Sequence, residues 1–254
     1  MNTNSTITFD SPEDRFIYSS RITYYKEKRE IYQLIETGKE IGENLHITKL
    51  NFLNGKTESV VNLLNKFTNL IWELDSTNIN IIELNEIWKE IHPNNSKEPQ
   101  NSLSNSYHLR RMLKLQEYII FDLYKFISQT IAAVWILQNP AEKEVKVPDI
   151  GAYLYINNPS NKSTLIFEDF SYFQDYFQTI NNLFNAYKHS FAYNDKIFLG
   201  FDEIIFFAID VKKNNFSKTP KCHYISLEDL ISTFNEFYEY SKTLIDNLTK
   251  TPTN

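Results

Sequence analysis

The chain has 254 residues, of which 42% are hydrophobic and 15% aromatic, so it can bury a packed core and is not expected to be disordered. A formal net charge of −6 argues against a broad phosphate-binding surface, because affinity for nucleic acid depends largely on clustered lysine and arginine. The single cysteine, Cys222, excludes an internal disulfide framework and a cysteine-rich metal site, which fits a reducing, cytoplasmic compartment.

The N-terminal region, residues 1–92, is expected to be helical. Residues 1–12 are polar and have neither the basic nor the apolar segment of a signal peptide, and a helix with a strongly charged face is expected over 13–38. Apolar residues spaced by three and four predict a helix over 58–74, followed by a shorter one over 81–91. The segment 93–105 is rich in Pro, Asn and Ser, and we interpret it as a loop or linker.

The remaining residues, 106–250, are expected to form a helical bundle, either as a separate unit or continuous with the first region. Its longest predicted helix, 106–137, becomes more apolar along its length and is expected at the centre of the core. Asp122 and Lys125 interrupt this apolar segment, and such charges are costly in a bilayer. A buried helix is therefore preferred over a membrane span.

The second half of this region alternates breaks with short elements. Pro140, Pro148 and Pro159 predict loops, with one short strand at 153–156, and a helix is expected over 167–191. Two strands, 204–211 and 222–225, predict a hairpin, and Ser226 is a suitable N-cap for a terminal helix. The predicted fold class is thus mainly α: a helical bundle with a small β-hairpin inserted before the C-terminal helix.

No standard catalytic or cofactor motif is found in the sequence. The five glycines are too dispersed for a phosphate-binding loop, and no two of the five histidines are closer than 16 residues. Cys222 has only His223 beside it, and in a strand these two side chains would point to opposite faces. No cofactor and no metal is therefore expected.

The helix predicted over 167–191 carries a polar cluster beside an aromatic stripe. At about 100° per residue, one buried stripe is expected to contain Phe173, Phe177, Ile180, Phe184, Tyr187 and Phe191. Asn181, Asn185 and His189 fall on a second stripe at its border, where polar groups are partly desolvated and need partners. Two interpretations stay open: Asn185 and His189 serve packing only, or the stripe lines a cleft or interface. In the second, His189 is an acid–base group, Asn185 orients it or the substrate, and Lys188 supplies charge.

The segment from Phe184 to His189 resembles the Arg-Asn-x-x-x-His motif of the HEPN superfamily, helical bundles found in bacterial toxins, abortive-infection proteins and CRISPR-associated ribonucleases. Asn185 and His189 match the motif, whereas Phe184 stands in the place of its arginine. The resemblance implies metal-independent RNA cleavage, and a homodimer or a partner with a related helix, because the motif helices of two subunits commonly meet in that family. An arginine at position 184 would have to be buried in the apolar stripe, at considerable cost unless paired.

A second basic cluster, with His108, Arg110 and Arg111, lies near the start of the longest predicted helix. Positive charge there opposes the helix dipole and calls for a compensating anion. One interpretation is pairing with acidic residues, such as Glu117 or a more distant glutamate. The other is that Arg110 or Arg111 packs against the helix of His189 and completes a site for RNA phosphate.

These patterns lead to three hypotheses of function. The first is a HEPN-like protein of a bacterial defence or toxin–antitoxin-type system that binds a protein partner, with RNA as a further ligand, away from membranes. The second is an active, metal-independent ribonuclease that uses His189 with Arg110 or Arg111. The third is a helical protein that binds a small molecule among its aromatic residues, which a deep apolar cavity opening at His189 or His223 would favour.

Overall fold

The computed structural model describes residues 57–91, 102–139, 142, 144–189, 203–210 and 219–249. The mainly helical fold with a hairpin before the last helix is confirmed. Residues 1–56, which include the predicted helix 13–38, and residues 93–101 of the predicted linker lie outside the described residues. The described elements, in chain order, are α3 (Thr57–Ile91), α4 (Ser102–Gln138), α5 (Ile150–Ile156), the 3-10 turn η2 (Ser171–Phe173), α6 (Gln174–His189), β1 (Ile205–Asp210), β2 (Lys221–Ser226) and α7 (Leu227–Thr249).

Helix α3 is one continuous helix of 35 residues, so the prediction of two separate helices over 58–74 and 81–91 was wrong. The intervening residues, 75–80, are polar except for Ile79 and form helices poorly in isolation. In the structure, however, Thr77 and Asn78 are buried. The Thr77 hydroxyl lies 2.8 Å from the carbonyl oxygen of Glu73 and 3.1 Å from Oδ2 of Asp122 on α4. Contacts with the neighbouring helix thus override the weak local preference.

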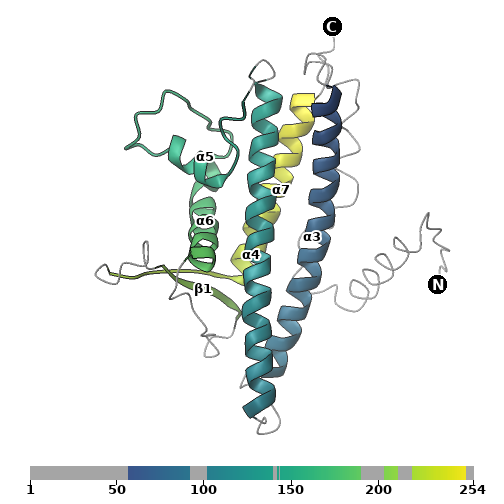
Figure 1. Cartoon of the computed structure of the whole chain (residues 1–254), viewed down its shortest axis with the longest axis vertical. Coiled ribbons are helices and arrows are strands. Elements are labelled where there is room, and N and C mark those ends of the chain that lie inside the picture. Colours follow the sequence, from purple (N-terminus) through teal and green to yellow (C-terminus); the bar gives the residue numbers. More distant parts are fainter. Residues whose placement is uncertain are drawn as a thin grey trace, which may run out of the picture.

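Helix α4 is the central element, as predicted for residues 106–137. Figure 1 shows it running the length of the molecule, with α3 and α7 alongside it and α5, α6 and the hairpin on its other side. Its 37 residues begin at Ser102, so the last four residues of the predicted linker belong to the helix. Of the described helices, the segment Tyr107–Gln138 alone is long and apolar enough to cross a membrane by length and composition. In its most apolar window 61% is buried inside the protein, and core helices of soluble proteins pass the same test.

Helix α5 occupies the place of the strand predicted at 153–156, which corrects that prediction. Asp149 caps the helix, because its Oδ1 accepts a hydrogen bond of 2.7 Å from the amide of Ala152. Tyr153 is fully buried and contacts the rings of Phe167, Phe170 and Phe177. The alternating aromatic residues suggested a strand, but the cap and this aromatic cluster select a helical turn.

Helix α6 begins at Gln174, later than the predicted start at residue 167. The chain before it is irregular apart from η2, and Asn157 donates a hydrogen bond of 2.8 Å to the carbonyl oxygen of Phe167. That contact holds Phe167 in the loop that returns from α5. Phe191, the predicted last residue of the helix, lies outside the described residues.

Strands β1 and β2 form the predicted antiparallel hairpin, with Ile205 opposite Ser226 and Asp210 opposite Lys221. Alternate residues of β1, Phe206 and Ala208, are fully buried in the core. The amide of Asp229 donates a hydrogen bond of 3.0 Å to the Ser226 hydroxyl, which confirms the predicted N-cap of α7. The hairpin is therefore joined directly to the last helix and anchored on its inner face.

Candidate functional site

The buried face of α6 differs from the predicted stripe. The prediction holds for Phe173, Phe177, Ile180 and Tyr187, which are buried, but Phe184 is only partly buried. The helix packs on α4, α5 and both strands, so its buried arc is wider than one stripe. Two hydroxyls anchor it: Tyr176 donates to the carbonyl of Leu230 (3.1 Å) and Tyr187 to that of Phe207 (3.2 Å). The buried residues of α6 are Tyr176, Phe177, Ile180, Leu183, Ala186 and Tyr187.

Phe184, in the position of the motif arginine, packs against α4. Its ring stacks on Tyr124 with centroids 3.8 Å apart and an interplanar angle of 6°, and it meets Phe121 edge-on at 5.0 Å. The Lys188 ammonium lies 5.4 Å from the centre of the Phe184 ring, within range of a cation–π contact. Burial, together with the carboxylate of Asp149, raises the pKa of the Tyr124 hydroxyl, so this ring stays neutral. Position 184 thus fixes α6 on α4.

The polar residues of α6 lie next to Phe184 on the outside of the helix. Asn185, Lys188 and His189 are exposed, while Asn181 is partly buried. The side-chain amide of Asn185 donates a hydrogen bond of 3.2 Å to Oδ1 of Asn181. The prediction that these side chains are partly buried is therefore confirmed for Asn181 and wrong for Asn185 and His189. We call the exposed surface of Asn185, Lys188 and His189 the α6 face.

Two residues of the basic cluster of α4, His108 and Arg111, contact glutamates of α3. Arg111 donates two hydrogen bonds to Glu83 from one edge of its guanidinium group, with Nε–Oε1 and Nη2–Oε2 distances of 2.6 Å. Nε2 of His108 lies 3.9 Å from Oε2 of Glu90, and Arg110 is exposed. For Arg111, pairing with a distant glutamate, the first of the two interpretations, is confirmed.

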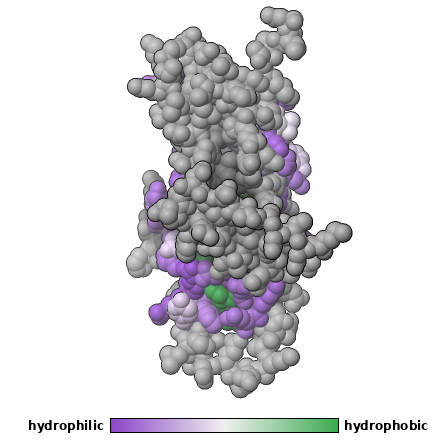
Figure 2. Space-filling model, turned by 90° about the vertical axis from the view of Figure 1, so that its right-hand side faces the viewer, coloured by the Kyte–Doolittle hydropathy of each residue, from purple (hydrophilic) through white to green (hydrophobic). Residues whose placement is uncertain are grey.

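Figure 2 shows the surface on the α3 side, where the described residues are mostly hydrophilic around a small hydrophobic spot.

The basic cluster of α4 and the α6 face lie apart along α4. Phe184 meets α4 at Phe121 and Tyr124, whereas Arg111 lies ten or more residues earlier, roughly 15 Å along a helix axis at 1.5 Å per residue. Arg111 is also bound to Glu83 on the α3 side. The structure therefore gathers the polar residues of α6 around Phe184 but does not bring Arg111 to them.

A polar cluster that sequence reasoning did not single out lies between α3 and α4. Lys125 forms an ion pair with Glu73, and the Thr77 hydroxyl contacts the carboxyl group of Asp122. Burial raises the pKa of Asp122 to about 6, although the hydrogen bond with Thr77 opposes the shift. Among the described residues no group of three or more His, Cys, Asp or Glu side chains could hold a metal ion. The cluster is thus a partly buried polar contact between the two longest helices.

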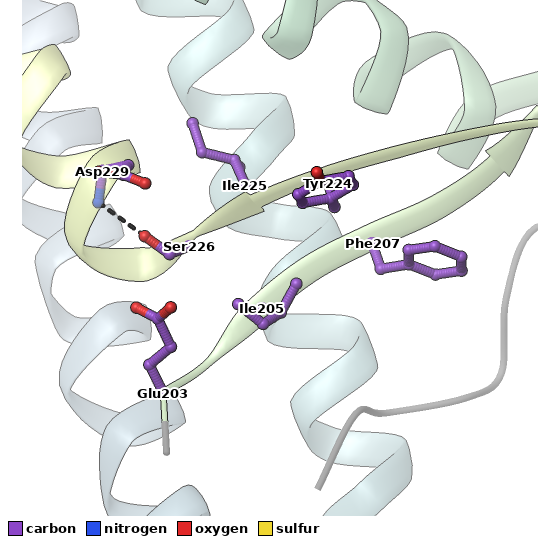
Figure 3. Close-up of a pocket in the computed structure, with 7 residues that line it drawn as sticks. All are labelled: Glu203, Ile205, Phe207, Tyr224, Ile225, Ser226 and Asp229. Atoms are coloured by element: carbon purple, nitrogen blue, oxygen red, sulfur yellow. Dashed lines mark hydrogen bonds between the residues drawn. The ribbon is translucent and has the colours of Figure 1, made fainter. Parts of the chain in front are cut away.

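A pocket on the outer face of the hairpin was also missed from the sequence. It has a volume of about 420 Å³, and Figure 3 shows its apolar and acidic residues just before and on β1, on β2 and at the start of α7. Neither His189 nor His223 lines it, so it is not the cavity that would favour the small-molecule hypothesis. A signal was present in the uninterrupted apolar run 204–209, because a solvent-facing hairpin normally alternates apolar with polar residues. We call it the hairpin pocket; its lining residues are Glu203, Ile205, Phe207, Tyr224, Ile225, Ser226 and Asp229.

Comparison with protein-family models, curated proteins and solved structures finds no match to this chain. The HEPN resemblance therefore stays an inference from residues 184–189 and a helical setting.

Proposed function

We propose that the chain is a HEPN-like helical protein that binds a protein partner through the α6 face, in a bacterial defence or toxin–antitoxin-type system. The carrying observation is that Asn185, Lys188 and His189 are exposed on a helix whose neighbouring residue, Phe184, is stacked on Tyr124. A helix held in this way presents its polar groups at fixed positions, which lowers the entropy cost of binding.

The geometry supports binding over RNA cleavage. Cleavage needs a cation that stabilises charge on the reacting phosphate, and an arginine fork serves this purpose best. Phe184 replaces the motif arginine, and Arg111 makes a two-point contact with Glu83 on α3. Lys188 is an exposed cation of the α6 face. RNA phosphate is therefore a further ligand that we propose for this face, bound through Lys188. The ribonuclease hypothesis requires an arginine at the α6 face, and no contact among the described residues places one there.

An acidic partner fits the α6 face better than a second copy of the chain. Lys188 and His189 form the basic last turn of α6. In a two-fold contact centred on this face, each Lys188 would approach its own copy, and like charges in contact repel. A partner that places a carboxylate there avoids the repulsion. We therefore expect a heteromeric complex.

The test is affinity capture of the full chain, tagged at its C-terminus, from the cells that encode it. Wild type is compared with Asn185→Asp/Lys188→Glu and with the control Lys162→Glu, an exposed charge reversal in the loop after α5. We expect one discrete partner to be retained by wild type and by the control, and to be lost from the double variant. A clean monomer, or a partner retained equally by all three proteins, would contradict the proposal.

A further inference from the structure

The outer face of the hairpin is apolar where a two-stranded hairpin would normally present polar groups to water. Ile205, Phe207 and Tyr224 share this face, because Phe207 lies opposite Tyr224 and Ile205 lies two residues before Phe207. The inner face is already occupied, since Phe206 and Ala208 are fully buried. Tyr224 is 69% exposed and, with its neighbours, forms the apolar part of the hairpin pocket. On this face Tyr224 is exposed, while Ile205 and Phe207 are partly buried.

One end of the hairpin pocket is acidic. Glu203 and Asp229 both line it, both are exposed, and neither pairs with a cation among the described residues. The position of Asp229 in the first turn of α7 is favourable because it faces the positive end of the helix dipole. Glu203 precedes β1, belongs to no helix, and points toward the first turn of α7 (Figure 3). The two carboxylates together give the apolar pocket a negative rim.

The free edge of β2 borders the same face. The amide of Leu227 bonds to the carbonyl of Ile204, so this pair and every second pair after it exchange the ladder hydrogen bonds. The backbone groups of Cys222 and Tyr224 then point away from β1. The corresponding free groups of β1 are partly used, because Gln116 donates to the carbonyl of Ile205. Among the described residues no hydrogen bond uses these groups of β2, so this edge can pair with an extended chain.

We propose that the hairpin pocket binds an extended segment of a partner protein that carries a bulky apolar side chain and, on the same face, a lysine or arginine. The apolar side chain enters the pocket against Phe207 and Tyr224, the cation pairs with Glu203 and Asp229, and the main chain follows the edge of β2. A second copy of this chain fits less well, because its net charge of −6 opposes approach to an acidic rim. The site is distinct from the α6 face and does not depend on a partner bound there.

The experiment uses the full chain and three fluorescein-labelled peptides, read by fluorescence anisotropy. The first is Ser-Lys-Ser-Trp-Ser-Lys-Ser, in which one strand face carries Lys, Trp and Lys. The second replaces both lysines by glutamate, and the third replaces tryptophan by alanine. We expect the first peptide to bind with a Kd of about 1 mM or tighter, and the other two at least about tenfold more weakly.

Matched variants locate the binding. Tyr224→Ser should weaken the first peptide about tenfold, whereas Tyr172→Ser, which removes a tyrosine 81% exposed outside the pocket, should not. The double variant Glu203→Gln/Asp229→Asn should weaken binding of the first peptide and make that binding less dependent on salt. Glu228→Gln, a neighbour that does not line the pocket, should change the affinity for this peptide little. Thermal melts check that each variant is folded.

Three results would overturn the proposal. The first is no binding to folded wild type at about 1 mM protein, and the second is equal binding of the lysine and glutamate peptides. The third is self-association of wild type, measured by sedimentation, that is lost in Tyr224→Ser. The pocket would then be occupied by a second copy of the chain. Loss of a partner from the α6 face has no effect on any of these readouts.

Discussion

Replacing Asp122 by asparagine is expected to stabilise the protein at neutral pH. Burial between α3 and α4 raises the pKa of this carboxyl group from 3.8 to about 6. The native state therefore holds a proton between these values that the unfolded chain has lost, so the free energy of unfolding falls as pH rises through this window. The full shift corresponds to about 3 kcal/mol, and partial exposure of the group reduces this to about 1–2 kcal/mol. Asn keeps the size of the side chain and its contact with Thr77 but carries no charge.

Urea unfolding followed by circular dichroism measures this effect at pH 4 and at pH 7.5. Asp122→Asn should raise the free energy of unfolding by about 1–2 kcal/mol at pH 7.5, with little change at pH 4, where the carboxyl group is protonated in the native state. Glu239→Gln, an exposed change on α7, is the control and should have little effect at either pH. Destabilisation by Asp122→Asn at pH 7.5, or the same pH dependence in wild type and variant, would refute the reasoning.

Three further predictions concern contacts that join two helices or cap a helix. A double-mutant cycle of Arg111→Ala and Glu83→Ala should give a coupling of about 0.5–1 kcal/mol that shrinks in high salt, because the pair is partly exposed; zero coupling would mean that the contact is not formed. Phe184→Ala should cost about 2 kcal/mol, with a coupling of about 1 kcal/mol to Tyr124→Ala, and additive effects would argue against the stacked pair. Asp149→Ala should cost about 1 kcal/mol through loss of the α5 cap, and an unchanged urea midpoint would exclude that role.

The elements that the sequence predicted well are those with local signals. The hairpin follows from two segments with strand-forming residues, 204–211 and 222–225, separated by polar residues. The α7 cap follows from Ser226 and the acidic first turn after it. The continuity of α3 could not be predicted, because Thr77 is stabilised by Asp122, 45 residues later in the chain. Helix α5 was missed for a similar reason: the amide of Ile150 donates to the hydroxyl of Ser128, on a different helix.

The candidate site was only partly visible in the sequence. Asn185 and His189 were identified with their helix, but periodicity alone assumed one packing neighbour for α6, whereas it has several, and Phe184 was therefore placed too deep. The pairing of Arg111 with Glu83 joins two helices and has no local signature. The hairpin pocket requires knowing which strand face is buried, and a fully apolar run such as 204–209 does not distinguish the two faces.

We propose that the α6 face binds a partner and does not cleave RNA. It is tested most directly by incubating the purified full chain with fluorescently labelled single-stranded RNA in EDTA, beside His189→Ala. We expect that neither protein cleaves the RNA faster than buffer does. Metal-independent cleavage by wild type that is lost in His189→Ala would contradict it.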